Sequence, residues 1–297
     1  MAWVQLHIST DPDNAEILET LLMDLGAVSV AMEDDEDQPL YEPDRGTTPL
    51  WMSTRVTGMF EARTNLQQIR EALAEQYHQI TQQPLGPVEV EVVEDKDWTR
   101  SWMDDFAPMQ FGERLWICPS WHEPPDEDAV NLFLDPGLAF GTGTHPTTAL
   151  CLRWLDGADL EGKTVIDYGC GSGILGLAAL LLGADIVIGV DNDPQALEAS
   201  RENARRNRVI AGKLQVYLPE YAPNDSADVL VANILAQPLL ALAPMLAGRV
   251  RPGGDIILSG ILTTQAQQLL DHYSQWFTMD EPEIEDNWVC LHGIRHR

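Results

Sequence analysis

The feature that most constrains the fold is a regular alternation of short apolar runs with longer helical segments after Gly162. In order, the segments read TVIDYG, ILGLAALLL, DIVIGVD, PQALEASRENARRN, LQVYL, ADVLVAN, ILAQPLLALAPMLA and DIILSG. Such alternation predicts a parallel, doubly wound sheet whose crossovers are helices. The chain ends with FTMDEP and NWVCLHGI, which lie too close in sequence for a crossover and must therefore pair antiparallel.

The first 95 residues follow a different pattern. Four segments alternate like strands, and two segments with apolar residues at helical spacing separate them; the strands are WVQLHIS, VSVAME, WMSTRVTGMFE and VEVEVVE. The order β-α-β-β-α-β is that of a ferredoxin-like domain. A chain of 297 residues is long enough for two domains. We therefore expect a ferredoxin-like domain over residues 1–95, a helical linker over 96–110 and an α/β domain over 111–297.

The chain is strongly acidic, with a net charge of −29. Residues 1–110 alone contain 22 acidic and 6 basic side chains. Such a surface repels nucleic acid and attracts basic partners at long range, although plain solubility would explain it equally well. The start of the chain lacks the pattern of a signal peptide, and its longest apolar run, ILGLAALLL, is about half a membrane span. The four cysteines are scattered without metal or redox spacing. We expect a cytoplasmic protein without a membrane segment, a disulfide or a metal site.

The stretch DYGCGSGILG, residues 167–176, joins the first strand of the parallel sheet to its helix. In an open α/β sheet, ligands bind beyond the carboxyl ends of the strands, and glycine lets the backbone approach them closely. Gly169 and Gly171 are therefore candidate cofactor contacts. The glycine spacing also matches the dinucleotide fingerprint, so a nicotinamide dehydrogenase and an enzyme of S-adenosylmethionine both remain open. An ordinary strand-to-helix turn often contains glycine as well.

Polar residues follow two further strands. Asp191 ends the second strand, where its carboxylate can accept hydrogen bonds from both hydroxyls of a ribose; Asp193 before Pro194 is the better cap for the next helix. Asn233 ends the fourth strand. Its side-chain carbonyl and the neighbouring backbone carbonyl can accept hydrogen bonds from a substrate amine, unless Asn233 only caps the following helix. A methyl donor also needs acceptors for its ammonium group, and we expect Asp167 to suit that cation.

The segment LDPGLAFGTGTHPTT, residues 134–148, precedes a helix and is rich in glycine, proline and threonine. It could be an elaborate turn, or a lid over the cofactor in which Thr144 or Thr148 donates a hydroxyl. His145 is a candidate general base, but a single histidine in a loop is more often structural.

Four motifs in their order and spacing closely resemble the PrmA family, the methyltransferases of ribosomal protein L11: FGTGTHPTT, VIDYGCGSGILG, GVDNDPQALEASRENARRN and VANILA. The resemblance implies a seven-stranded, Rossmann-like class I methyltransferase domain that uses S-adenosylmethionine as the donor. It also implies that Thr148, Gly169, Asp191 and Asn233 contact this cofactor, in addition to Gly171 of the glycine turn.

The resemblance further implies a substrate, the basic ribosomal protein L11, methylated on lysine side chains and on its N-terminal amine. The ferredoxin-like domain would hold it, which gives the acidic surface a partner of opposite charge. Methyltransferases of planar nitrogens commonly carry Asn-Pro-Pro-aromatic where this chain has NILA, residues 233–236. The missing aromatic fits an aliphatic amine, which Asn233 is predicted to orient.

Two other classes of protein remain compatible with the sequence. A nicotinamide oxidoreductase fits the glycine turn and Asp191 but leaves NILA and the antiparallel ending unexplained. A non-catalytic protein that binds the donor for regulation fits everything except the need for an amine site at Asn233.

Overall fold

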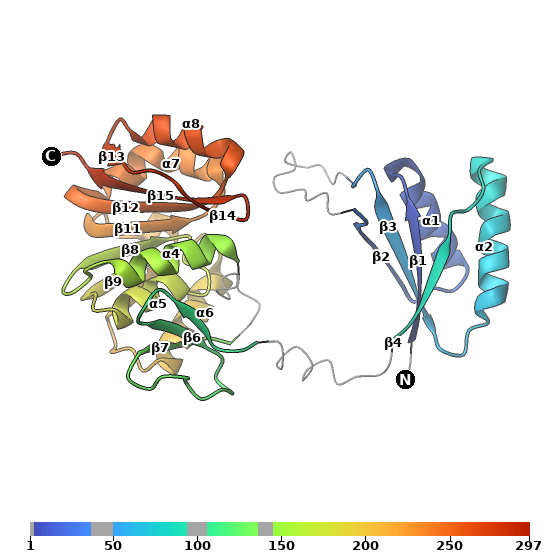
Figure 1. Ribbon diagram of the computed structural model, residues 1–297, viewed down its shortest axis with the longest axis horizontal. Coiled ribbons are helices and arrows are strands. Elements are labelled where there is room, and N and C mark those ends of the chain that lie inside the picture. Colours follow the sequence, from blue (N-terminus) through green and yellow to red (C-terminus); the bar gives the residue numbers. More distant parts are fainter. Residues whose placement is uncertain (1–2, 37–49, 94–105, 136–144) are drawn as a thin grey trace. The chain divides into compact units, whose positions relative to one another are not determined.

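The computed structural model describes residues 3–36, 50–93, 106–135 and 145–297 and divides into two compact units, Met1–Met103 and Asp104–Arg297 (Figure 1). The acidic loop after residue 36 and most of the predicted helical linker lie outside the described residues. No helix in the described parts of the chain is long and apolar enough to cross a membrane. All four cysteines are buried and free.

The first unit is an antiparallel sheet with the strand order β2-β3-β1-β4 and two helices. Alternate residues of the central strands, such as Leu6 and Phe60, pack against Leu18 and Leu73 of the helices and form an apolar core. The elements are β1 (Trp3–Thr10), α1 (Pro12–Asp24), β2 (Ser29–Asp34), β3 (Thr54–Glu61), α2 (Leu66–Thr81) and β4 (Val88–Val93).

The second unit contains a mixed sheet with the strand order β10-β9-β8-β11-β12-β15-β13. The strands from β10 to β12 in this order run parallel, as the alternation of strands and helices predicts. β15 runs antiparallel to both neighbours, which confirms the predicted antiparallel ending. The strands are β8 (Thr164–Tyr168), β9 (Ile186–Val190), β10 (Leu214–Tyr217), β11 (Ala227–Asn233), β12 (Val250–Leu262), β13 (Phe277–Met279), β14 (Glu283–Glu285) and β15 (Trp288–Arg295).

The sheet differs from the expected seven strands by one short addition, because β14 pairs with β15 outside the main path. The turn between them consists of Asp286 and Asn287, whose φ angles are 47° and 66°. Two consecutive residues with positive φ form the tight turn that matches the twist of a hairpin. The additional strand therefore follows from local turn chemistry.

Helices cover both faces of this sheet, as Figure 1 shows. Successive residues of β8, Val165 and Ile166, belong to different apolar cores, so both faces of the strand are buried. One core contains α4 (Pro146–Gly157) and α5 (Ile174–Leu181); the other contains α7 (Ala236–Gly248) and α8 (Thr263–Tyr273). α6 (Pro194–Arg206) packs beside β10, and a small sheet of β5 (Met109–Phe111), β6 (Leu115–Cys118) and β7 (Val130–Phe133) precedes α4.

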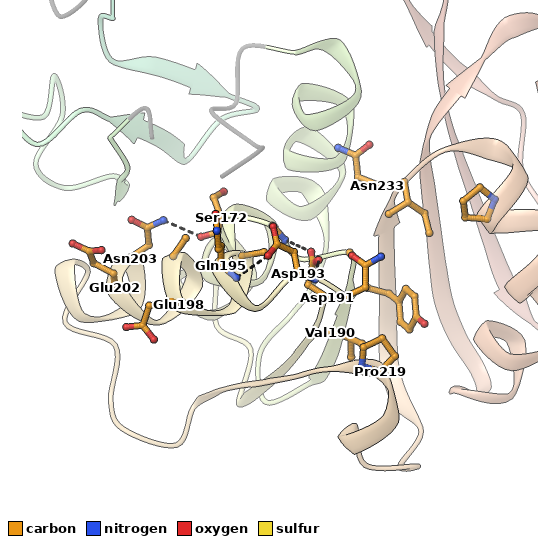
Figure 2. Close-up of a pocket in the computed structure, with 18 of the residues that line it drawn as sticks. Ser172, Val190, Asp191, Asp193, Gln195, Glu198, Glu202, Asn203, Pro219 and Asn233 are labelled. Atoms are coloured by element: carbon orange, nitrogen blue, oxygen red, sulfur yellow. Dashed lines mark hydrogen bonds between the residues drawn. The ribbon is translucent and has the colours of Figure 1, made fainter. Parts of the chain in front are cut away.

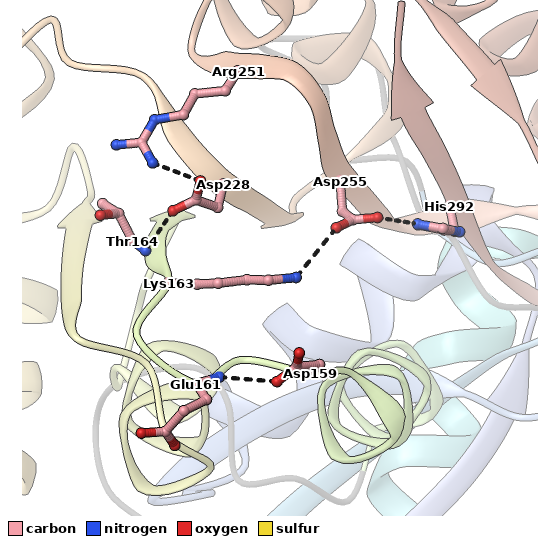
Figure 3. A network of polar contacts seen from close by, with 8 residues as sticks. All are labelled: Asp159, Glu161, Lys163, Thr164, Asp228, Arg251, Asp255 and His292. Carbon is pink, nitrogen blue, oxygen red and sulfur yellow. Dashed lines mark hydrogen bonds and ion pairs between the residues drawn. The ribbon is translucent and has the colours of Figure 1, made fainter.

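Charged side chains join the strands at the amino ends of β8, β11 and β12 (Figure 3). Asp228 accepts a hydrogen bond from the backbone of Thr164 at 2.9 Å and one from Arg251 at 2.5 Å. Asp255 Oδ1 lies 3.0 Å from His292 Nε2 of β15. Ion pairs at a protein surface contribute at most about 1 kcal/mol each, so the apolar cores supply most of the stability. The opposite edge, where the parallel strands end, carries the glycine turn.

Candidate functional site

A cavity of about 1190 Å³ opens at the carboxyl ends of β8, β9 and β11 (Figure 2). Its lining includes Gly169, Gly171, Asp191 and Asn233, all of which the sequence singled out. Thr148 does not line the cavity, because its side chain is buried in the first turn of α4. The fold therefore brings together four predicted residues at the ends of three strands, whereas Thr148 lies outside the cavity lining.

The glycine turn is closed by hydrogen bonds within the protein. The backbone N–H groups of Gly169 and Cys170 both donate to the carbonyl of Val190, at 2.7 and 3.1 Å. Gly171 has a φ of 53°, which lies in the left-handed region, and its N–H donates to Asp191 Oδ2 at 2.9 Å. A pyrophosphate needs free N–H groups at such a turn. Since these N–H groups are already engaged, the turn suits a ligand without phosphate better than a dinucleotide.

Asp191 is less free than the sequence indicates. Its Oδ2 accepts from Gly171 and its Oδ1 accepts from the backbone N–H of Asp193 at 3.0 Å. Each carboxylate oxygen keeps a second lone pair, so the side chain can still accept hydrogen bonds from a ribose in the cavity. The predicted helix cap is confirmed, because Asp193 accepts from the N–H of Gln195 at 2.8 Å and Pro194 begins α6.

Asn233 does not cap the helix that follows it. The cap position of α7 is Leu235, whose side chain supplies no capping hydrogen bond. Instead, Asn233 Nδ2 donates to Thr148 Oγ1 at 3.2 Å. This contact joins β11 to α4 across 85 residues of sequence. It orients the carboxamide, and no residue in the described ranges donates a hydrogen bond to Asn233 Oδ1.

His145 is the N-terminal cap of α4. Its Nδ1 lies 2.8 Å from Thr147 Oγ1 and accepts from the backbone N–H of Thr147 at 3.4 Å. Its ring packs edge-on against Trp288, with 4.9 Å between the ring centroids. Burial lowers its pKa. The histidine side chain therefore caps the N-terminus of α4. Thr144 and most of the predicted lid lie outside the described residues.

Asp167, which we expected to accept hydrogen bonds from the ammonium group of a methyl donor, does not lie on the wall of the cavity. Its side chain is only 1% exposed. Oδ2 accepts from the backbone N–H of Gly176 at 2.9 Å, while Oδ1 has no partner among the described residues. Burial raises the pKa of this carboxyl to about 7, the hydrogen bond from Gly176 opposes the rise, and the charge of Asp191 adds to it. Asp167 therefore supports the glycine turn from beneath.

The pKa of Asp167 leads to a stability prediction. Its folded-state pKa lies above the ordinary value of 3.8, so its contribution to stability is complete below that value and is lost as the pH rises through about 7. Asp167→Asn, which keeps an acceptor for Gly176 but cannot ionise, should show a smaller fall in Tm between pH 5 and pH 8 than the parent protein. Calorimetric unfolding at both pH values measures this.

The matched control is Asp193→Asn, because Asp193 is an exposed carboxylate that also accepts one backbone hydrogen bond. The fall in Tm between pH 5 and pH 8 should be the same for Asp193→Asn as for the parent protein. If Tm falls equally with rising pH in Asp167→Asn and in the parent protein, the raised pKa of Asp167 is contradicted.

The rim of the cavity is acidic. Asp193, Glu198 and Glu202 line it together with Arg206, which forms an ion pair with Asp135 at 3.3 Å. Glu198 forms ion pairs with Arg201 and Arg205, so Asp193 and Glu202 contribute most of the negative charge. An acidic rim attracts a cationic ligand. Sequence reasoning did not single out this rim, because the acidic residues of α6 resemble an ordinary solvated helix face.

Comparison with known proteins decides the family. The profile of the family described as "Ribosomal protein L11 methyltransferase (PrmA)" matches residues 2–296. The chain belongs to this family. It is 64% identical to a ribosomal protein L11 methyltransferase of Marinobacter nauticus over 99% of both chains, and 52% identical to one of a Marinomonas species over the full length of both. A crystal structure of a ribosomal protein L11 methylase from Lactobacillus delbrueckii subsp. bulgaricus is 33% identical, with a TM-score of 0.59, and covers 65% of this chain and 100% of its own.

Membership of the PrmA family removes both alternatives. The chain is a methyltransferase and neither a nicotinamide oxidoreductase nor a non-catalytic binding protein. The match also extends through the first unit, where the sequence showed the expected layout of elements without an identifiable motif.

Proposed function

We propose that this PrmA-family enzyme transfers methyl groups from S-adenosylmethionine to the lysine side chains and the N-terminal amine of ribosomal protein L11. The observation that supports this most directly is the oriented carboxamide of Asn233. With Nδ2 engaged by Thr148, Oδ1 is the atom left to accept a hydrogen bond from an amine at the carboxyl end of β11.

The cavity fits S-adenosylmethionine, a cation that carries a ribose and no phosphate. Gly169 and Gly171 would let the backbone approach it, and Asp191 would accept hydrogen bonds from the ribose. Asn233 would border the reacting end, and Thr148 would act through Asn233. The engaged N–H groups of the turn and the acidic rim both match this ligand. When bound, S-adenosylmethionine supplies an electrophilic methyl group.

The protein's part in the reaction is to orient a neutral amine. A lysine ammonium has an unperturbed pKa of about 10.4 and must lose a proton before it can attack. Entry into a desolvated site favours the neutral form, and water can take the proton. Asn233 Oδ1 and the backbone carbonyl of Ile234, which also lines the cavity, would then accept the N–H groups of the amine. Such alignment of the reactants supplies most of the rate.

The two units have separate roles in this proposal. The first unit has the order β-α-β-β-α-β and would be a ferredoxin-like domain that holds the substrate protein. The second unit, in which seven strands lie in one path, would be the class I methyltransferase domain. A chain with a net charge of −29 would attract a basic ribosomal protein.

Transfer of labelled methyl from S-adenosylmethionine to ribosomal proteins tests this function, with ribosomes from cells that lack the enzyme. We expect label in L11 alone, and mass spectrometry should place it on lysine side chains and the N-terminal amine. Label on glutamine, arginine or another ribosomal protein would contradict the proposal, as would the absence of label despite tight donor binding.

A further inference from the structure

A bulge interrupts β12 at Ser259 and Gly260, next to the candidate amine site. The antiparallel pairing of β12 with β15 shifts register between Leu258 and Ile261. Gly260 has a φ of 82°, a left-handed conformation that side-chain-bearing residues rarely adopt. Residue 259 is paired with Asn233 across the parallel strands, so the bulge follows directly beside the end of β11. Bulges often occur where a site requires a locally redirected strand.

Gly260 packs directly on the backbone of Ile234, the residue that follows Asn233. A Cβ atom at Gly260 would collide with the carbonyl oxygen of Ile234 and would lie 2.8 Å from its carbonyl carbon. On the other side, a Cβ atom at Gly169 would overlap the Ile234 side chain. Ile234 is thus held between the glycine turn and the β12 bulge, and either glycine can be replaced only if Ile234 moves.

The carbonyl oxygen of Ile234 remains available as an acceptor. The N-terminal cap of α7, Leu235, is extended with a ψ of 153°, and the first helical bond runs from Leu239 N to Leu235 O at 3.2 Å. Ile234 O therefore lies outside the helix ladder, and no residue that the structure describes donates a hydrogen bond to it. In the proposed reaction this carbonyl would be a second acceptor beside Asn233 Oδ1, since Ile234 lines the cavity.

Two acceptors are what an unmethylated amine needs. The nitrogen of a neutral primary amine carries its alkyl chain, two hydrogens and one lone pair in a tetrahedral arrangement. When both hydrogens are held by fixed acceptors, the lone pair can point in only one direction. An amine that already carries two methyl groups has no N–H and cannot use either acceptor.

We propose that Gly260 is a positioning residue of the amine site: its missing side chain keeps the Ile234 carbonyl in place and open to the second N–H of the acceptor amine. This assignment rests on the proposed methylation of L11 and extends it to a residue that acts through Ile234. It makes the first methyl transfer to each amine more dependent on Gly260 than the last.

The test compares Gly260→Ala with two controls on the same strand. Gly253→Ala places a side chain at a φ of 79° with no atom within 4 Å, so it reproduces the backbone strain alone. Gly254→Ala brings a Cβ within 2.6 Å of the Asp228 carbonyl oxygen, so it reproduces a carbonyl clash at the opposite edge of the sheet. Each variant is assayed for kcat and KM on L11, for donor affinity by calorimetry, and for Tm.

For Gly260→Ala we expect kcat on unmodified L11 to fall about 100-fold, as for a displacement of about 1 Å at a reacting centre, with donor affinity and KM little changed. On L11 whose amines have been dimethylated by reductive alkylation, the fall in kcat should be much smaller. The two controls should lower Tm and retain kcat. If Gly260→Ala does not fold, Gly260→Asn replaces it, because asparagine tolerates positive φ better and introduces the same Cβ.

Several results would overturn the assignment. Normal kcat in the folded variant would do so, as would loss of donor affinity in proportion to kcat, an equal loss of kcat in the controls, or an equal fall on dimethylated L11. Failure of the parent enzyme to methylate L11 would instead overturn the proposed function itself, and this assignment with it.

Discussion

Replacement of Asn233 by alanine is expected to lower methyl transfer to ribosomal protein L11 by about 100-fold or more, the cost of losing one aligned polar group at a reacting centre. Binding of S-adenosylmethionine should weaken far less, because Gly169, Gly171 and Asp191 remain. The physical reason is that Asn233 Oδ1 is the acceptor left free by the hydrogen bond from Nδ2 to Thr148. Single-turnover kinetics with labelled donor measure the transfer, and calorimetry measures donor binding.

Variants at Thr148 are the control for this prediction. Thr148→Val keeps the shape of the side chain but removes the hydroxyl that accepts from Asn233, so it should reproduce part of the loss in kcat. Thr148→Ser keeps the hydroxyl and should retain most of the activity. An unchanged single-turnover rate in Asn233→Ala would refute the orienting role.

Deletion of residues 1–95 is expected to leave donor binding intact and to abolish methylation of intact L11. Among the described residues, those that line the cavity lie between Asp135 and Leu242, within the second unit, and that unit has two apolar cores of its own. The deleted segment contains much of the acidic charge that the proposal assigns to holding the basic substrate. Calorimetry with S-adenosylmethionine and transfer of labelled methyl to L11 measure the two properties separately.

A folded truncated enzyme is required for this comparison. A rise in its Tm with increasing donor concentration establishes both folding and binding, since a ligand that binds only the folded state stabilises it. Normal methylation of intact L11 by that protein would show that the first unit is not the recognition module.

Sequence patterns determined the features that depend on neighbouring residues. The alternation of apolar runs and helical segments after Gly162 predicts the parallel strands, and the short interval between the last two segments predicts their antiparallel pairing. Asp193 before Pro194 predicts the start of α6. These inferences succeed because strand period, helix capping and the reach of a short connection are set within a few residues.

Only the tertiary structure decided what the site residues contact, because these contacts involve groups distant in the chain. Asp167 lies near the end of a strand, as a ligand-binding carboxylate would. In the structure its side chain is buried and accepts a hydrogen bond from the backbone N–H of Gly176. Thr148 matches a cofactor contact by motif, yet the approach of α4 to β11 makes it the partner of Asn233. In the sequence, Gly260 is an ordinary strand glycine. In the structure, the bulge in β12 brings it against the carbonyl of Ile234. No periodicity or spacing encodes such contacts, since they arise where separate strands end at the same edge of the sheet.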